Sequence, residues 1–269
     1  MANVTGEMYA VGARRGVIFE LNAAGMPDAI APAHTAYEGI ELLGLKTFEP
    51  TIPPVRNIVH SGNDRVMAFD FLPAIEGIGG TLSVAGRDFG LDAMIAAVKE
   101  VTLNETKYVA QGTDQQGAEP DVALFVFQQA KDASSRSRRY RFHIVPKCVI
   151  SATPPGMNEN PAETKYSLAI NPTTQHLWGT ALSIATDGCL EAGMIEGMSE
   201  GRPNLVAWLG DGVETEFLFP TSKPATVTTK IHGVWVAGVI DASVGKTVTG
   251  VTPTTMPTAG QIVVALYEY

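Results

Sequence analysis

Short apolar segments separated by glycine and proline turns are the feature that most constrains how this chain can fold. No apolar run is longer than six residues, and the longest are Ala93–Val98 and Val122–Phe127. Runs of this length are too short to cross a bilayer as helices and are typical of strands. The chain also carries 27 glycines and 17 prolines in 269 residues, which supply turns between the runs. We therefore expect a mainly β protein.

The first two hundred residues contain six segments with the apolar pattern of strands. They are Arg14–Asn22, Arg65–Leu72, Gly80–Val84, Asp121–Gln129, Arg138–Val145 and Thr164–Ile170. The fourth and fifth predict a hairpin. Helical spacing is found over Phe89–Val101, where Leu91 and Ile95 fall on one narrow apolar face. This face predicts a single helix that lies on a sheet.

A change in composition near Gly201-Arg202-Pro203 predicts a domain boundary. Beyond it, proline and glycine turns separate four short strand-like segments: Glu214–Phe219, Val227–Ala237, Lys246–Val251 and Ile262–Tyr267. This spacing is typical of a small all-β module. We expect residues 1–203 to form the main domain and residues 204–269 to form a C-terminal β module.

Charge and metal-ligating residues exclude several classes of function. The chain has 28 acidic and 19 basic residues, and its net charge of −9 argues against a general nucleic-acid binder. Two cysteines are too few for a disulfide framework or a four-cysteine zinc site. The five histidines show no pair at metal-ligand spacing, so we expect no metal and no cofactor. His143 alternates with Phe142 and Ile144, which indicates a solvated or hydrogen-bonded strand residue. The first twenty residues lack the apolar stretch of a secretion signal.

One short motif matches an enzyme signature. Gly197-Met-Ser199-Glu-Gly201 fits the G-x-S-x-G pattern of hydrolases, and Asp211 and His232 follow in the expected order. The context differs, because Arg202-Pro203 discourages the helix that must follow the serine. We interpret the segment as a hinge between the two domains and expect no enzymatic activity.

Basic residues gather at the tip of the predicted hairpin. The stretch from Lys131 to Arg141 holds five cations and one aspartate, a local charge of +4. Such a strip can be a solvated tip, a phosphate contact or one half of a charge-complementary interface. Acidic positions that could supply the other half are Glu38, Glu41, Glu49 and Glu76.

A proline-bearing stretch follows the first strand. Pro50, Pro53 and Pro54 exclude regular central pairing there. Loops longer than about 15 residues are usually functional or ordered by a partner. We therefore predict that the irregular stretch from Glu38 to Asp64 is functional or ordered by a partner.

The order of these segments resembles that of the major tail proteins, or tail tube proteins, of tailed bacteriophages. The resemblance covers most of residues 1–200. It rests on the segments Tyr9–Phe19, Phe89–Val101, Val122–Val145, Val145–Cys148, Asn171-Pro172 and Gly179–Ala181. The C-terminal segment is similar to small β modules appended to many phage structural proteins, through Gly210–Gly212, Thr215–Pro220 and Pro257–Tyr267.

This resemblance implies a β-sandwich or barrel with one flanking helix, assembled into stacked hexameric rings. The rings would form the conduit for DNA ejection, and an acidic wall suits passing double-stranded DNA that is not bound specifically. The implied partners are further copies of the chain, the tape measure protein, the tail terminator and the baseplate, with no membrane. The implied location is the virion tail, after assembly in the bacterial host cytoplasm. Contractile and non-contractile (siphophage) tails both stay open.

Ring contacts are implied for the N-terminal arm, Met1–Ala13, and for the loop at 46–64. The candidate residues for self-assembly and contacts between rings are Arg14, Arg15, Glu49, Arg56, Asp64, Arg136, Arg138, Arg139 and Arg141. The C-terminal module would project outward as a decoration.

A second hypothesis is a capsid-decoration or baseplate adhesion protein whose C-terminal module binds a host surface glycan. Trp208, Trp235 and Tyr267 would then stack on the sugars. The competing interpretation of these three residues is a buried aromatic core.

Overall fold

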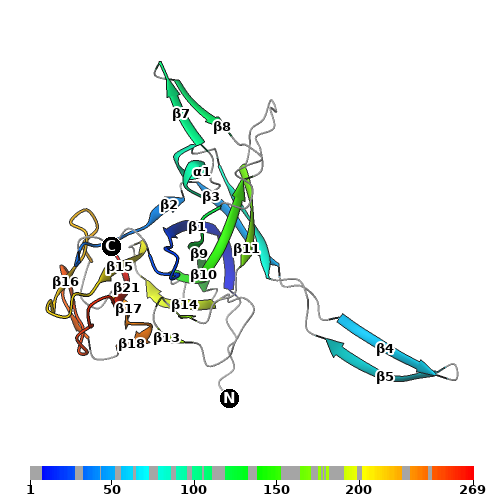
Figure 1. Ribbon diagram of the computed structural model, residues 1–269. Helices are drawn as coiled ribbons and strands as arrows, with labels where there is room; N and C mark the ends of the chain where they lie inside the picture. Colours follow the sequence, from blue (N-terminus) through cyan, green and yellow to red (C-terminus); the bar gives the residue numbers. More distant parts are fainter. Residues whose placement is uncertain are drawn as a thin grey trace.

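Strands dominate the computed structural model of the chain (Figure 1). The structure describes residues 8–27, 33–42, 44–51, 56–62, 65–72, 78–85, 89–95, 99–104, 106–110, 119–132, 138–152, 164–170, 175–176, 178, 180–181, 191–198, 202–225, 231–241 and 244–269. All the strand pairings in these residues are antiparallel. The prediction of a mainly β protein is confirmed.

An eight-stranded sheet forms the centre of the main domain. Seven strands follow the order β2, β1, β9, β10, β11, β6, β3, and β14 also pairs with β10. Their bounds are β1 Met8–Glu20, β2 Ile40–Leu42, β3 Leu45–Thr51, β6 Gly79–Val84, β9 Val122–Asp132, β10 Arg138–Ala152, β11 Thr164–Ile170 and β14 Glu191–Met198. The long β10 holds this sheet together, because its first half pairs with β9 and β14 and its second half with β11.

The sheet curls until β3, at one end of the order, lies against β1, near the other end. Gly16 in β1 permits this approach. A Cβ atom at Gly16 would lie 2.8 Å from Leu42 Cδ1 and 3.1 Å from Leu45 Cδ2, closer than packed atoms tolerate. A larger residue at this position would require the side chains of Leu42 and Leu45 to shift.

The continuous apolar run of β9 is explained by burial on both faces. Val122, Leu124 and Val126 face an inner core, whereas Phe125 and Phe127 face an outer one. Successive strand residues point to opposite faces, so a strand that is covered on both faces is apolar at every position.

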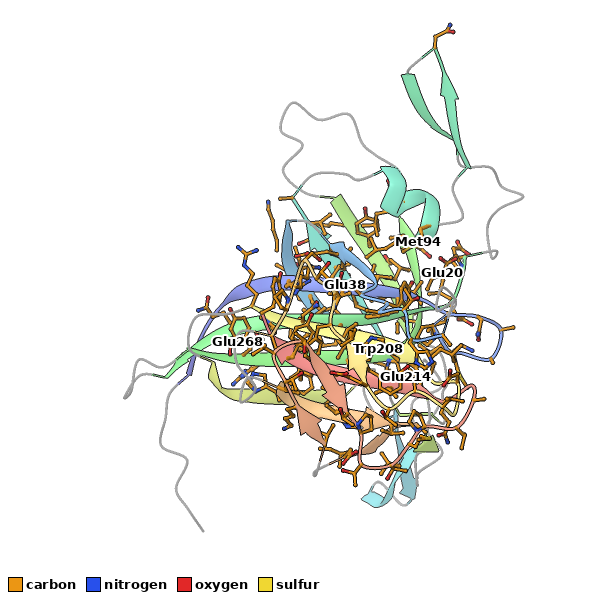
Figure 2. All side chains as sticks on the ribbon, turned by 90° about the vertical axis from the view of Figure 1, so that its left-hand side faces the viewer. Glu20, Glu38, Met94, Trp208, Glu214 and Glu268 are labelled. Carbon is orange, nitrogen blue, oxygen red and sulfur yellow. The ribbon has the colours of Figure 1, made fainter. Side chains whose placement is uncertain are left out.

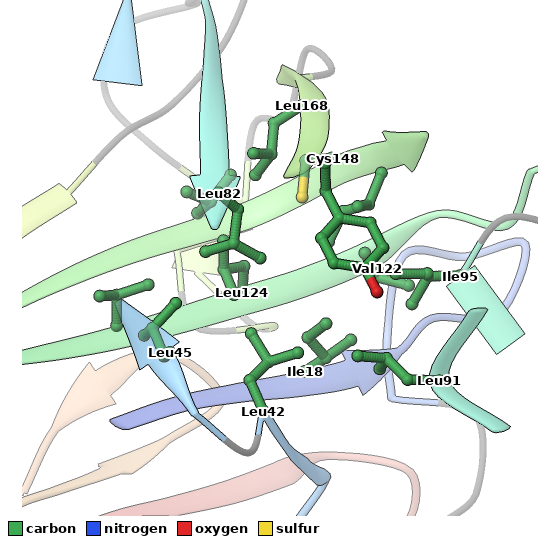
Figure 3. Packing of buried hydrophobic residues seen from close by; sticks show 14 of the residues in the cluster. Ile18, Leu42, Leu45, Leu82, Leu91, Ile95, Val122, Leu124, Cys148 and Leu168 are labelled. Atoms are coloured by element: carbon green, nitrogen blue, oxygen red, sulfur yellow. The ribbon is translucent and has the colours of Figure 1, made fainter. Parts of the chain in front are cut away.

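A short helix, α1 (Phe89–Ile95), closes the inner core (Figure 3). Leu91 and Ile95 pack into that core with residues of seven strands of the sheet. Between them Asp92, which is fully buried, accepts a hydrogen bond from Tyr166 Oη at 2.8 Å. This bond ties the helix to β11.

The C-terminal module consists of two small sheets. One has the order β15, β21, β17, β18 and the other the order β16, β20, β19. Their bounds are β15 Pro203–Leu209, β16 Phe217–Leu218, β17 Ile231–Val236, β18 Val239–Ile240, β19 Gly245–Lys246, β20 Gly250–Thr252 and β21 Ile262–Glu268. A core that includes Trp208, Phe217 and Tyr267 fills the space between them, and Figure 2 labels Trp208 inside this module.

The module packs against the outer face of the main sheet. One hydrophobic cluster is shared by the main domain and by β15 and β21, and its members include Phe19, Phe125, Trp178, Leu205, Val264 and Leu266. We call this contact the seam. The connection from β14 to β15 consists of the four residues 199–202. The module is therefore seated on the sheet of the main domain.

Two hairpins extend away from the central sheet in different directions (Figure 1). β4 (Arg56–Gly62) pairs with β5 (Arg65–Leu72), and β7 (Lys99–Leu103) pairs with β8 (Thr106–Ala110). Within the residues that the structure describes, neither hairpin forms a ladder with any other strand. A further small pair joins β12 (Gln175–His176) to β13 (Thr180–Ala181).

The predicted strands at Arg65–Leu72 and Thr164–Ile170 are confirmed at the same bounds. The flanking helix expected over Phe89–Val101 does not have that extent: α1 covers Phe89–Ile95, and Lys99–Leu103 form β7. The β-branched residues Val101 and Thr102 favour the strand.

The predicted N-terminal arm and long loop are also corrected. Residues 8–13 of the expected arm belong to β1, which pairs with β9 from Met8 onward, and residues 1–7 lie outside the described part. The loop expected at 46–64 contains β3 and β4. Pro50 is tolerated in β3 because this strand ends the sheet order, so one of its edges needs no N–H donor.

Candidate assembly surfaces

A buried arginine fastens the seam. Arg15, only 5% exposed, donates a hydrogen bond to the carbonyl oxygen of Pro203 and forms a 3.2 Å ion pair with Glu41. Its guanidinium carbon also lies 5.2 Å from the ring centroid of Tyr269. A buried guanidinium is tolerated only when its donors and its charge are matched in this way. Arg15 therefore acts within the chain, between the main domain and the module.

Glu38, Asn204 and Tyr267 continue this polar network. Glu38 forms a 2.8 Å ion pair with Lys223 and accepts a 3.3 Å hydrogen bond from Asn204 Nδ2. Asn204 also donates to Tyr267 Oη at 2.9 Å, and that hydroxyl donates to the carbonyl oxygen of Lys223 at 2.8 Å. Burial raises the pKa of the Tyr267 hydroxyl above its ordinary value, so it stays a donor.

Residues 33–42, which we call the strap, link the edges of the two sheets. The N–H of His34 donates to the carbonyl oxygen of Leu209 at 3.1 Å, and Tyr37 and Ala207 exchange two backbone hydrogen bonds of 2.8 and 2.9 Å. The last part of the strap is β2, which pairs with β1. One continuous segment thus caps β15 of the module and β1 of the main sheet.

The first residues of the strap are held by a side-chain pair. His34 Nε2 lies 2.7 Å from Asp211 Oδ2, and His34 adopts a left-handed φ of 68°. Asp211 Oδ1 also accepts the N–H groups of Val213 and Glu214 at 2.7 and 2.9 Å. The hydrogen bond from Glu214, and after it the bond from His34, lower the pKa of Asp211 well below its ordinary value.

A mixed pocket of about 250 Å³ opens between β3 and the pair β9–β10. Phe48 and Val126 supply apolar walls, and Lys46, Gln128 and His143 supply polar ones. The ring of His143 lies 5.6 Å from that of Phe48. Its Nδ1 atom is buried and makes no hydrogen bond with the described residues. We call this cavity the His143 pocket.

A second cavity, of about 380 Å³, lies on the module beside the β17–β18 turn. Val239 and Ile240 at its rim are 59% and 61% exposed. Asp241 and Thr254 border it and are joined by a 2.6 Å hydrogen bond from the Thr254 N–H. This cavity combines an aliphatic surface with a carboxylate.

The predicted contact residues are dispersed over the main domain. Glu49 and Arg141 are exposed; Glu49 lines the His143 pocket and Arg141 precedes His143 by two residues on β10. Arg15 is buried in the seam, so it faces the module and not a neighbouring subunit. Four further candidates lie in strands, but their side chains are outside the described part: Arg14, Arg56, Arg138 and Arg139. Asp64 and Arg136 lie outside the described residues altogether.

Sequence reasoning missed two features of these surfaces: the contact of Arg15 with Pro203 and the burial of His143 Nδ1. Arg15 sits beside Arg14 in a basic pair that gives no sign of burial, and its partner Pro203 is 188 residues away. His143 was expected to be solvated or hydrogen-bonded, yet its Nδ1 is buried without a partner in the described residues. The local alternation of β10 indicates a face but not what covers it.

The hydrolase pattern is not accompanied by a triad in the described residues. Asp211 contacts His34, and His232 Nε2 lies 3.9 Å from Glu268 Oε2. Ser199 lies outside the described part of the chain. Among the described residues, no group of three or more histidine, cysteine or acidic residues could hold a metal ion. Nor does any helix described here have the length and apolar character needed to cross a membrane.

Comparisons with known proteins leave the family open. No family model matches this chain, and no curated protein is detectably similar to it in sequence. The function must therefore be argued from the chain's own residues and geometry.

Proposed function

We propose that this chain is a structural subunit of a bacteriophage tail tube that self-assembles into stacked hexameric rings and forms the conduit for DNA ejection. It acts without catalysis or cofactor. Its partners are further copies of itself, the tape measure protein, the tail terminator and the baseplate, and double-stranded DNA passes through without specific binding. The observation that carries the proposal is the pair of projecting hairpins.

The hairpins need a partner that the described chain does not supply. A two-stranded hairpin is at best marginally stable in water, and its outer edges carry unpaired N–H and C=O groups. β4, the first strand of the β4–β5 hairpin, lies in the stretch in which the sequence predicts a partner contact. The β7–β8 hairpin leaves the body in another direction (Figure 1). Two arms pointing in different directions suit a subunit with several neighbours of its own kind.

The body supports the same proposal because it is a rigid unit. The seam joins the module to the sheet through a shared hydrophobic cluster and the Arg15 network. A ring built from such subunits keeps its shape while the arms make the contacts. The acidic balance of the chain, −9 overall, also suits a wall that DNA slides past.

The test is direct observation of assembly. Purified protein is concentrated at neutral pH and examined by negative-stain electron microscopy and sedimentation velocity. We expect rings with a central hole or hollow stacked tubes. Replacing Arg56–Leu72 with a short Gly-Ser linker should abolish stacking and leave the monomer folded. Leu218→Ser, at a module position that is 54% exposed, is the matched control and should assemble normally. A monomer that stays monodisperse at high concentration contradicts the proposal.

The adhesion hypothesis has less support. Trp208 and Tyr267 are fully buried in the module core, and the half-buried Trp235 packs against the seam. The predicted sugar-stacking surface is therefore not formed by these residues. Glycan binding would have to use another surface, such as the Val239–Ile240 cavity.

A further inference from the structure

We propose that the His143 pocket is a docking site for an acidic side chain of a neighbouring copy of this chain. The inference rests on the proposed self-assembly and goes beyond it, because it names a contact and the chemistry of that contact.

The first observation is an unmatched polar atom. His143 is half-buried, and its buried Nδ1 has no hydrogen-bond partner in the part of the chain that the structure describes. Nearly all buried polar groups in native proteins are paired, and leaving one unpaired lowers stability. The contact with Phe48 also places the imidazole beside a neighbouring ring. Nδ1 is covered in the present orientation of the ring, so a carboxylate that enters the pocket pairs with it, and removes this cost, once the imidazole turns.

The size and walls of the pocket suit an acidic side chain. Its volume of about 250 Å³ accommodates a carboxylate with its methylene groups. Phe48 and Val126 offer apolar contact for the methylenes, and Gln128 is a further polar group in the lining. The pocket therefore combines an apolar entrance with polar groups inside.

Charge favours a carboxylate over a cation. Lys46 lines the pocket and Arg141 acts on His143 electrostatically, against the single carboxylate of Glu49. Burial, and after it Arg141, lower the pKa of His143, so a neutral imidazole can donate a hydrogen bond while the two cations attract the anion. A second copy of a chain with 28 acidic and 19 basic residues offers many carboxylates.

Position in the fold selects a second copy as the occupant. β3 lines the pocket and ends at Thr51, and the projecting β4 begins at Arg56. A neighbour that packs along the base of the β4–β5 arm thus lies beside the pocket. The pocket is continuous with the contact on which the proposed assembly depends.

Three variants test this inference in the full-length chain. His143→Phe removes the nitrogen and fills the space, Arg141→Glu reverses the charge, and Lys165→Glu is the control at an exposed cation on β11. The wild-type protein and the three variants are compared by the concentration that gives half assembly in sedimentation velocity, at low and high salt. Circular dichroism and thermal melting of the unassembled proteins report folding.

We expect His143→Phe and Arg141→Glu to raise the half-assembly concentration at least about tenfold, which corresponds to about 1.4 kcal/mol. Salt should weaken wild-type assembly and have little effect on Arg141→Glu. The melting temperature of His143→Phe should stay unchanged or rise, because an unpaired buried nitrogen is lost. Loss of assembly without loss of stability separates docking from a merely structural role.

Other outcomes overturn the inference in distinguishable ways. If the wild-type protein assembles and His143→Phe and Arg141→Glu assemble equally well, the pocket is not filled by a neighbour, while the proposed function survives. If Lys165→Glu impairs assembly as much as Arg141→Glu, the effect is one of overall charge and the pocket is not the site. If the wild-type protein never assembles, the proposed function and the inference fail together.

Discussion

The strands at the centre of the molecule and the hairpins that leave it are built on opposite principles. All seven residues of β21 and the first six of β9 are buried, because each strand has a strand on either side and a core on either face. β4–β5 and β7–β8 pair only within themselves in the described residues. The chain satisfies the hydrogen bonds and apolar faces of its centre, whereas the outer edges of the two hairpins join no ladder in the described residues.

This difference separates stability from assembly. Changes in the cores and in the seam should lower the free energy of unfolding of the monomer. Changes in the arms should leave that free energy nearly constant and act on association. Four predictions test the separation, from the largest expected effect to the smallest.

Phe19→Ala should give the largest loss of stability. Phe19 is fully buried in the seam, with its ring 5.2 to 5.4 Å from those of Tyr37, Phe125 and Trp178. Removing such a ring leaves a cavity and costs about 3–5 kcal/mol, measurable by urea unfolding. Removal of the β4–β5 hairpin should cost under about 0.5 kcal/mol by the same measurement. Equal losses of stability in the two variants would contradict the distinction between the buried centre and the hairpins.

Arg15→Leu should be the next most destabilising change. It leaves Glu41 and the carbonyl oxygen of Pro203 without their partner at the seam, at a cost of about 2–3 kcal/mol. Arg15→Lys keeps the charge but loses the forked geometry, and should recover less than half of that loss. Thermal melting compares the two. If Arg15→Leu melts like the wild-type protein, the seam does not depend on this contact.

Tyr267→Phe should cost about 1–2 kcal/mol, because it removes the donor to Lys223 O and the acceptor for Asn204. The ring stacked on Phe219 at 4.2 Å stays in place. A double-mutant cycle with Asn204→Ala, followed by urea unfolding, should give a coupling energy clearly different from zero. Additive effects would mean that the two side chains contribute independently.

Asp211→Asn should show a pH-dependent effect on the strap. The pKa of Asp211 is lowered in the folded protein, so its contribution is present above about pH 5 and is lost as the pH falls through the folded pKa. The difference in melting temperature between wild-type protein and Asp211→Asn should therefore be constant near neutral pH and shrink toward about pH 2. Glu214→Gln, an exposed change at the same turn, should show no such trend. A difference that grows on acidification contradicts the assignment.

The local patterns predicted much of the fold and less of the candidate site. A turn at Asn22–Gly25 follows the first predicted strand, with the Gly25 N–H donating to Asn22 O at 2.8 Å. Glu49 and Arg141 were predicted as contact residues and are exposed near the same pocket. The pocket itself was not predictable, because β3 is distant in sequence from the β9–β10 hairpin that supplies the other wall.

Local sequence patterns predicted the strand class and the positions of strands such as β5, β9, β11 and β21, because alternation, β-branching and glycine act over a few residues. They did not predict strands such as β3, β4, β14 and β15. Three features became visible only in the folded chain: Arg15 joins the main domain to the module, Trp208 and Tyr267 are core residues, and the module lies on the sheet. These outcomes depend on what covers each face, and the contacts that cover them join residues as far apart as Arg15 and Pro203. A local pattern can show that a face must be buried, but only the folded chain selects its partner.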